Sequence, residues 1–156
     1  LFAELGVDYS AAEATAYYED QLSQKGFVFP DTIKLLDTLY GRYKLYIVSN
    51  SGAYVQTGRM ADCGIVKYFE DIFISENAGA EKPSREFFDY CFGRRPEIKT
   101  DESVIIGDSL TSDIQGGINA GIRTIWFNPD GQQAVDIHPD YEVKTLMEIP
   151  VLLEEL

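Results

Sequence analysis

The chain has 156 residues, a formal net charge of -13 at pH 7 and a hydrophobic fraction of 45%, which suits one globular domain with a sizeable core. The strong acidity argues against nucleic acid as a partner, because a phosphate backbone requires a basic surface. No apolar run approaches the roughly 18 residues of a membrane span, and two cysteines without metal-ligand spacing favour a reducing, cytoplasmic setting.

The elements expected along the chain alternate between helices and short apolar strands. The Ser10-Ala-Ala-Glu13 capping box predicts a helix over about 10–24. Next come a helix from Pro30-Asp31 to Gly41, a strand at 44–48, a helix at about 53–62, a strand at 71–75, a helix from Pro83 through Cys91, a strand at 103–106, a helix at about 113–120, a strand at 123–127, a weak strand near 141–143 and a helix containing Pro150. This alternation predicts βαβ units, hence an α/β fold with a parallel sheet.

A polar turn, Ser49-Asn50-Ser51-Gly52, directly follows the strand at 44–48. Its hydroxyl and backbone N–H groups could hold phosphate oxygens, although such turns are also common for conformational reasons. Lys82, just before the helix that starts at Pro83, could neutralise charge that develops on a bound anion. A solvated lysine is the simpler alternative at that position.

Two carboxylates follow the strand at 103–106. Asp108 comes after Gly107 at the carboxyl end of the strand, where open α/β sheets place their ligands. Asp113 lies in the first turn of the expected helix, and the two acids together could hold a hard cation or orient a lysine. Alternatively, Asp108 or Ser109 caps the helix, and Asp113 interacts with the helix dipole alone.

Taken together, YIVSN at 46–50, EKP at 81–83 and IIGDSLTSD at 105–113 resemble the haloacid dehalogenase superfamily. The run GDSLTSDIQGGINAG, followed by TIWFNP, is most similar to the nucleotidase-type phosphatases of that superfamily. The resemblance implies a Rossmann-like parallel sheet with helices on both faces, formed by residues 26–156. It also implies that residues 1–25 are the C-terminal part of a helical cap.

The same resemblance implies a magnesium-dependent phosphatase that splits small phosphomonoesters, nucleoside 5′-monophosphates among them, through an aspartyl-phosphate. By motif, Ser49 and the backbone amide of Asn50 would bind the phosphoryl group, and Lys82 would hold nucleophile and phosphate together. Asp108 would be a magnesium ligand. Asp113 would anchor Lys82 or a metal-bound water, so it is expected both among the catalytic residues and at the metal.

One family motif is missing from the sequence. The nucleophile and the general acid/base of the family are two aspartates separated by one residue, D-x-D-x-T/V, and no two aspartates of this chain have that spacing. The first strand and the start of the cap are therefore expected to precede Leu1. These 156 residues alone are expected to be inactive.

In the family, the nucleophile strand lies between the strands that carry Ser49 and Asp108. Without it, two facing sheet edges would have unpaired backbone groups. The chain could close the gap directly, borrow a strand from a second copy and so self-associate, or be part of a longer polypeptide. A non-catalytic phosphate- or metal-binding or interaction module is the main alternative function, and a receiver-like phosphoacceptor domain is a third.

Overall fold

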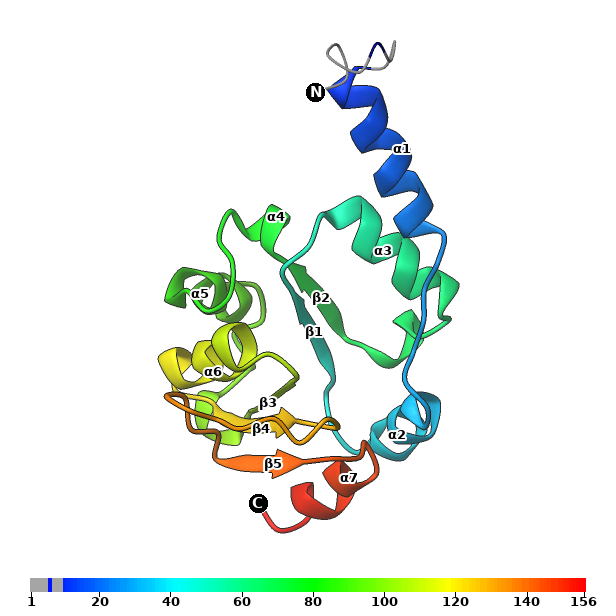
Figure 1. Ribbon diagram of the computed structural model, residues 1–156. Helices are drawn as coiled ribbons and strands as arrows, with labels where there is room; N and C mark the ends of the chain where they lie inside the picture. The colour runs from blue at the N-terminus through cyan, green and yellow to red at the C-terminus, as the bar shows by residue number, and fades with distance from the viewer. Residues whose placement is uncertain (1–5, 7–9) are drawn as a thin grey trace.

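The computed structural model describes residue 6 and residues 10–156, so the expected cap piece at 1–25 lies partly outside the described residues. The helices, in chain order, are α1 (Ala11–Ser23), α2 (Thr32–Leu39), α3 (Ala53–Asp62), α4 (Ser75–Ala78), α5 (Arg85–Arg94), α6 (Gln115–Ala120) and α7 (Glu148–Leu153), as Figure 1 shows. Shorter turns are η1 (Val66–Tyr68), η2 (Thr100–Glu102) and the π-helical η3 (Leu110–Ile114). The strands are β1 (Tyr46–Ser49), β2 (Asp71–Ile74), β3 (Val104–Gly107), β4 (Arg123–Phe127) and β5 (Tyr141–Val143).

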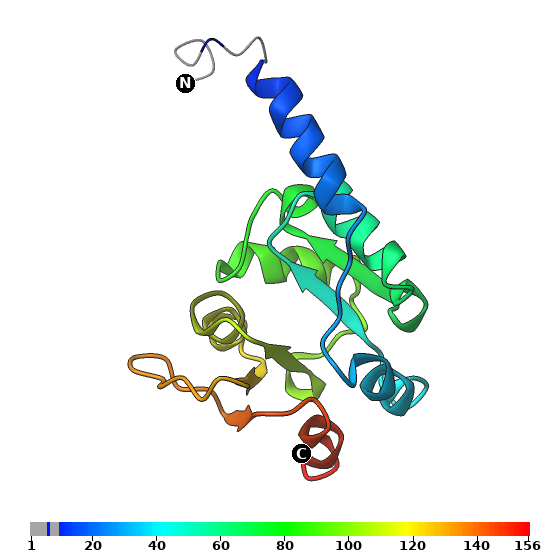
Figure 2. The ribbon, with the colours of Figure 1, turned by 45° about the vertical axis from the view of Figure 1, so that its right-hand side comes forward.

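The strands form two separate parallel sheets. β1 pairs with β2, and β3, β4 and β5 pair in that order. Within the described part of the chain no ladder of hydrogen bonds joins β1 to β3, and Figure 2 shows the two sheets as distinct groups of arrows. The predicted α/β fold with parallel strands is confirmed. Direct closure of the gap, one of the three expected outcomes, is not what the structure shows.

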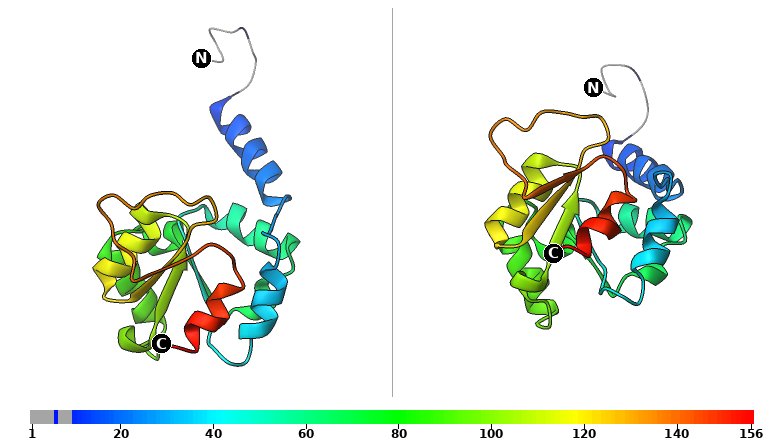
Figure 3. Two further views of the ribbon diagram at one scale, coloured as in Figure 1. Left: turned by 60° about the horizontal axis from the view of Figure 1, so that its bottom comes forward. Right: turned by 90° about the horizontal axis from the view of Figure 1, so that it is seen from below.

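Helical layers cover both faces of the strands and hold the two sheets together. On one face, α2 and α7 pack on the second sheet through a cluster formed by Leu35, Leu39, Ile125, Phe127, Val143 and Ile149. On the other, α5 and α6 contribute to a cluster formed by Phe73, Phe87, Phe88, Cys91, Ile105 and Ala120. Because this second cluster takes Phe73 from β2 and Ile105 from β3, it spans both sheets. Figure 3 shows the strands between the two layers.

Helix α1 projects from the body of the molecule (Figure 1) and begins with the predicted capping box. The Ser10 hydroxyl accepts a hydrogen bond from the Glu13 amide at 3.1 Å, and the Glu13 carboxylate accepts one from the Ser10 amide at 2.9 Å. The end of the helix packs on α3, where a Cβ added to Gly58 would lie 2.7 Å from Ser23. None of the described helices is long and apolar enough to cross a membrane.

Candidate functional site

A buried ion pair lies at the carboxyl ends of β1 and β3. The Lys82 ammonium donates to the Asp113 carboxylate at 2.6 Å and to the backbone carbonyl of Val48 at 2.8 Å. Lys82 is 8% exposed and Asp113 is 7% exposed, so each charge depends on the other for compensation. The sequence left open whether Lys82 is solvated; the structure places it in the interior, beside the strand that ends at Ser49.

Asn50 fixes the backbone of Lys82 through its side chain. Its amide nitrogen donates to the Lys82 carbonyl at 2.8 Å, and its amide oxygen accepts from the Lys82 N–H at 2.9 Å. We expected the Asn50 backbone to bind phosphate and had no role for the side chain. The pair of contacts ties the end of β1 to the start of α5, across 32 positions of sequence.

Asp113 lies in the π-helical turn η3, before α6, and not in the first turn of an α-helix as expected. One carboxylate oxygen binds Lys82, and the other accepts from the Ser109 N–H at 3.1 Å. Ser109 caps the turn through a bond from the Ser112 N–H at 3.2 Å, as one alternative predicted. A Cβ at Gly107 would overlap the Asp113 side chain, so this glycine is required for space rather than for a tight turn.

The polar turn after β1 is braced by residues that follow β2. The Ser51 N–H donates to the Ser75 hydroxyl at 3.1 Å, and the Ala53 N–H donates to the Glu76 carboxylate at 2.6 Å. Glu76 therefore caps α3, whose own N-cap residue, Gly52, has no side-chain acceptor. We had not predicted either contact, although a helix that starts at glycine indicates that its first N–H groups need a partner from elsewhere.

Asp108 directly follows β3, shortly before Asp113 in the sequence, and its side chain is exposed. The carboxylate makes no hydrogen bond or ion pair with other described residues, while the Trp126 indole N–H fixes its backbone carbonyl at 2.9 Å. Among the described residues no group of three or more His, Cys, Asp or Glu is close enough to hold a metal. Each oxygen of Asp113 already accepts one hydrogen bond, so of the two expected metal ligands Asp108 has the carboxylate with no partner among the described residues.

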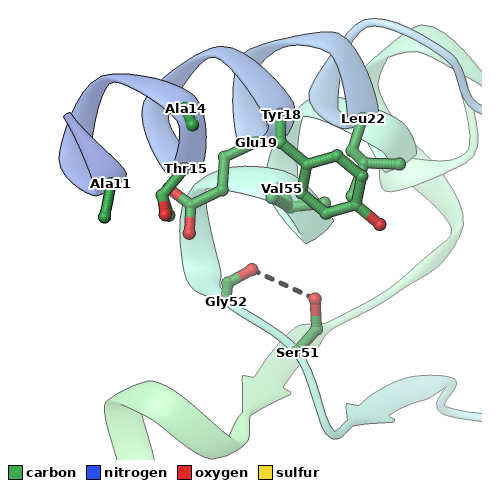
Figure 4. Close-up of a pocket in the computed structure, with 9 residues that line it drawn as sticks. All are labelled: Ala11, Ala14, Thr15, Tyr18, Glu19, Leu22, Ser51, Gly52 and Val55. Atoms are coloured by element: carbon green, nitrogen blue, oxygen red, sulfur yellow. Dashed lines mark hydrogen bonds between the residues drawn. The ribbon is translucent and has the colours of Figure 1, made fainter. Parts of the chain in front are cut away.

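Two hollows lie on either side of the turn after β1 and share Ser51 and Gly52 as lining residues. The larger, about 590 Å³, lies between α1 and the start of α3 (Figure 4). Thr15, Tyr18 and Glu19 project from α1 toward the turn, as the figure shows. The smaller hollow, about 450 Å³, extends toward Glu76 and Glu81.

The arrangement has the parts of an anion-binding site. Lys82 has three N–H donors, of which two are used by Asp113 and Val48, so one remains for a ligand. Ser49 follows Val48 directly, and its hydroxyl makes no hydrogen bond with other described residues. The structure thus brings Lys82 and Asp113 into contact and places Ser49 directly after Val48, to which Lys82 is bonded. It also gives the Asn50 side chain a task that was not expected.

The chain is similar in sequence and in structure to several known proteins. The family model of the haloacid dehalogenase-like hydrolases matches residues 1–127. The chain is 38% identical over 150 residues to the HAD-hydrolase YfnB of Bacillus subtilis and 37% identical over 151 residues to the pyrimidine 5′-nucleotidase PynA of Streptococcus pneumoniae. Each match covers 96% of this chain and 64% of the relative, so the chain spans slightly less than two thirds of their length. The crystal structure of YfnB bound to magnesium gives a TM-score of 0.86 at 38% identity, over 94% of this chain and 65% of that one.

Proposed function

The chain belongs to the haloacid dehalogenase-like hydrolases, and we propose that it forms most of a magnesium-dependent phosphatase for small phosphomonoesters. The observation that supports this best is the buried Lys82–Asp113 pair at the end of the strand that carries Ser49. A buried cation with one unused donor, next to a serine, suits a phosphoryl group better than it suits an uncharged ligand.

Each polar group has a separate task in this proposal. Lys82 donates its remaining N–H to a phosphoryl oxygen and offsets the negative charge of phosphate and nucleophile. Asp113 keeps the ammonium in position and compensates its charge when no ligand is bound. Ser49 and the Asn50 backbone amide donate to the other phosphoryl oxygens. The Asn50 side chain holds the Lys82 backbone next to the end of β1.

Magnesium is the cofactor in this proposal. A magnesium ion keeps most of its waters and takes one or two carboxylates together with substrate phosphate, so the exposed carboxylate of Asp108 suffices as the ligand from this chain. When bound there, the ion neutralises charge on the phosphoryl oxygens. The YfnB structure, which is bound to magnesium, supports this choice of metal.

The nucleophile in this proposal is a carboxylate from outside residues 1–156, because no pair of aspartates in the chain has the D-x-D spacing. Its attack on phosphorus forms an aspartyl-phosphate and releases the alcohol. Water then releases inorganic phosphate, so one phosphomonoester and one water yield one alcohol and one phosphate. We therefore expect the 156-residue chain alone to be inactive.

Nucleoside 5′-monophosphates are the substrates that we propose. PynA, and YjjG of Escherichia coli at 34% identity over 80% of this chain, are named pyrimidine 5′-nucleotidases. The larger hollow offers a flat partner for a base, because Tyr18 lines it while remaining 63% exposed.

A magnesium-dependent phosphatase assay tests the proposal. Uridine 5′-monophosphate should be hydrolysed by a longer form that includes the coding sequence upstream of Leu1, and by neither the 156-residue chain nor a Lys82→Met variant of the longer form. Turnover by the 156-residue chain would contradict the external nucleophile. Phosphate binding without turnover by a longer form with a D-x-D segment would favour the binding-module alternative.

A further inference from the structure

We propose that this site discriminates by charge: it accepts phosphomonoesters whose leaving group is uncharged and rejects those whose leaving group carries a second anionic group, with Glu19 as the main determinant. The inference rests on the proposed phosphatase function, because it concerns the part of the substrate that lies beyond the phosphoryl group. It follows from the distribution of charge around the turn after β1.

The two hollows beside that turn have acidic linings. Glu19 lines the larger one and Glu76 and Glu81 line the smaller one, whereas none of the described lining residues is Lys, Arg or His. The cation nearest along the chain, Lys82, turns its ammonium toward Asp113 and Val48. A leaving group that fills either hollow therefore meets carboxylates without a compensating cation.

The start of α3 would ordinarily attract an anion, because the first N–H groups of a helix carry partial positive charge. Here the Glu76 carboxylate already holds the Ala53 N–H at 2.6 Å. A second anionic group on the substrate would have to displace that carboxylate or lie beside it. Both outcomes cost free energy, so the start of α3 disfavours a second anionic group on the substrate.

Glu19 is the residue best placed to act on the leaving group. It projects from α1 toward Ser51 and Gly52 beside Tyr18 (Figure 4). It makes no hydrogen bond or ion pair with other described residues, so none of them compensates a carboxylate at the lining of the hollow. A carboxylate in this position accepts hydrogen bonds from hydroxyl or amino groups of a neutral leaving group, and repels a carboxylate or phosphate on the same group.

Uridine 5′-monophosphate and uridine 3′,5′-bisphosphate test the inference, because they differ by one phosphate and share the base and the 5′-ester. For the longer form, we expect kcat/KM for the 5′-ester to be at least tenfold lower with the bisphosphate, mainly through KM. Glu19→Lys should lower the ratio of kcat/KM for the monophosphate to kcat/KM for the bisphosphate at least fivefold, and Glu19→Gln should lower it by less. Raising the salt concentration should narrow it as well, because screening weakens the repulsion. Glu155→Lys makes the same change of charge at an exposed position near the C-terminus and should leave the ratio unchanged.

Equal kcat/KM for the two esters, or a ratio that neither Glu19→Lys nor salt alters, would overturn the charge discrimination and leave the phosphatase proposal intact. Failure of the longer form to hydrolyse either ester would instead contradict the phosphatase proposal. In that case, calorimetric titration of the 156-residue chain with each nucleotide and Mg²⁺ decides. Weaker binding of the bisphosphate that Glu19→Lys relieves supports the inference, and equal binding or no binding overturns it.

Discussion

The strands β4 and β1 have similar apolar sequences, RTIWF and YIVS, but different surroundings. β4 lies between β3 and β5 and is buried from Thr124 to Phe127, with Ile125 0% exposed. Among the described residues β1 pairs on one side alone, with β2, and all four of its residues are half-buried. In β3, Ile106 is 39% exposed although it is in register with Ile125 of β4. β4, which is paired on both sides, is therefore more deeply buried than β1, although both strands are apolar.

This difference in burial distinguishes the part of the molecule that forms the core from the part that carries polar site residues. The well-packed part of the molecule surrounds β4, whereas the polar turn of the candidate site that begins at Ser49 follows β1, the less buried strand. Ligand-binding elements commonly belong to the less stable parts of a fold. The ion pair of Lys82 and Asp113 and the helix α5 hold β1 in place where strand pairing does not. Four predictions test how far this division holds.

The largest effect should come from Lys82→Met. It leaves the Asp113 carboxylate buried without its cation, which typically costs about 3–5 kcal/mol in the free energy of unfolding. Chemical denaturation measures this cost. Lys99→Met removes the same type of side chain from the exposed Lys99–Glu102 pair and should cost less than about 1 kcal/mol. Equal losses for the two variants would mean that the Lys82 pair is not buried in solution.

Ile125→Ala should cost about 2–5 kcal/mol, because it opens a cavity in the core around β4. Ile47→Ala, on half-buried β1, should cost less than half as much. The shifts of the urea unfolding midpoints measure both losses, provided that the dependence of the unfolding free energy on urea concentration is unchanged. In a longer form that pairs a strand with the open edge of β1, the cost of Ile47→Ala should rise toward that of Ile125→Ala. If it stays the same there, the open edge of β1 is not a pairing site.

Gly107→Ala should destabilise by about 1–3 kcal/mol, because the added methyl group overlaps the Asp113 side chain. Gly93→Ala is a matched control within α5, where an added Cβ meets no atom within 4 Å. It should instead stabilise the protein, by up to about 1 kcal/mol, as alanine does in helices. Thermal unfolding of the two variants should therefore shift in opposite directions, and a common direction would contradict the close packing at Gly107.

The smallest effect concerns pH. Burial raises the pKa of the Cys91 thiol to about 12, so the native protein holds this proton after the unfolded chain has lost it. The unfolded state then binds fewer protons, and stability falls as pH rises above the ordinary thiol pKa. For an ordinary thiol pKa of 9.0, the loss from this group between pH 8 and 9.5 should be about 0.8 kcal/mol. Cys91→Ala should remove that part of the pH slope, and Cys63, which is partly buried, should react with thiol reagents before Cys91 does.

Most of the fold could be predicted from the sequence, because hydrophobic periodicity and caps define its longer elements. The bounds of α3, β4 and β5 are as predicted. Helix α4 was missed, since four residues are too few to show a helical period, and its first residue, Ser75, had been assigned to the preceding strand. The π-helical turn at Leu110–Ile114 was also missed, because it depends on a shift of hydrogen-bond register that residue type does not reveal.

The residues of the candidate site could be predicted from the sequence, but the hydrogen bonds that connect them could not. Motif order indicated Ser49, Lys82, Asp108 and Asp113, and the structure places Lys82 against Asp113. The tasks of Asn50 and Glu76 depend on contacts between turns that are far apart in sequence. Such contacts follow from the way in which the strands bring the turns together, which no local pattern records.

One lysine side chain bridges the two sheets at this edge, through hydrogen bonds to Val48 of β1 and to Asp113 after β3. The Lys82 N–H donates to the Asn50 side chain at the end of β1, and its ammonium donates to Asp113 in the turn after β3. Lys82 thus adds a polar link between two sheets that are also joined by the apolar cluster containing Phe73 and Ile105. A rotation of one sheet against the other would strain these hydrogen bonds, so the side chain that we propose to bind the anion is also sensitive to how the two sheets are aligned.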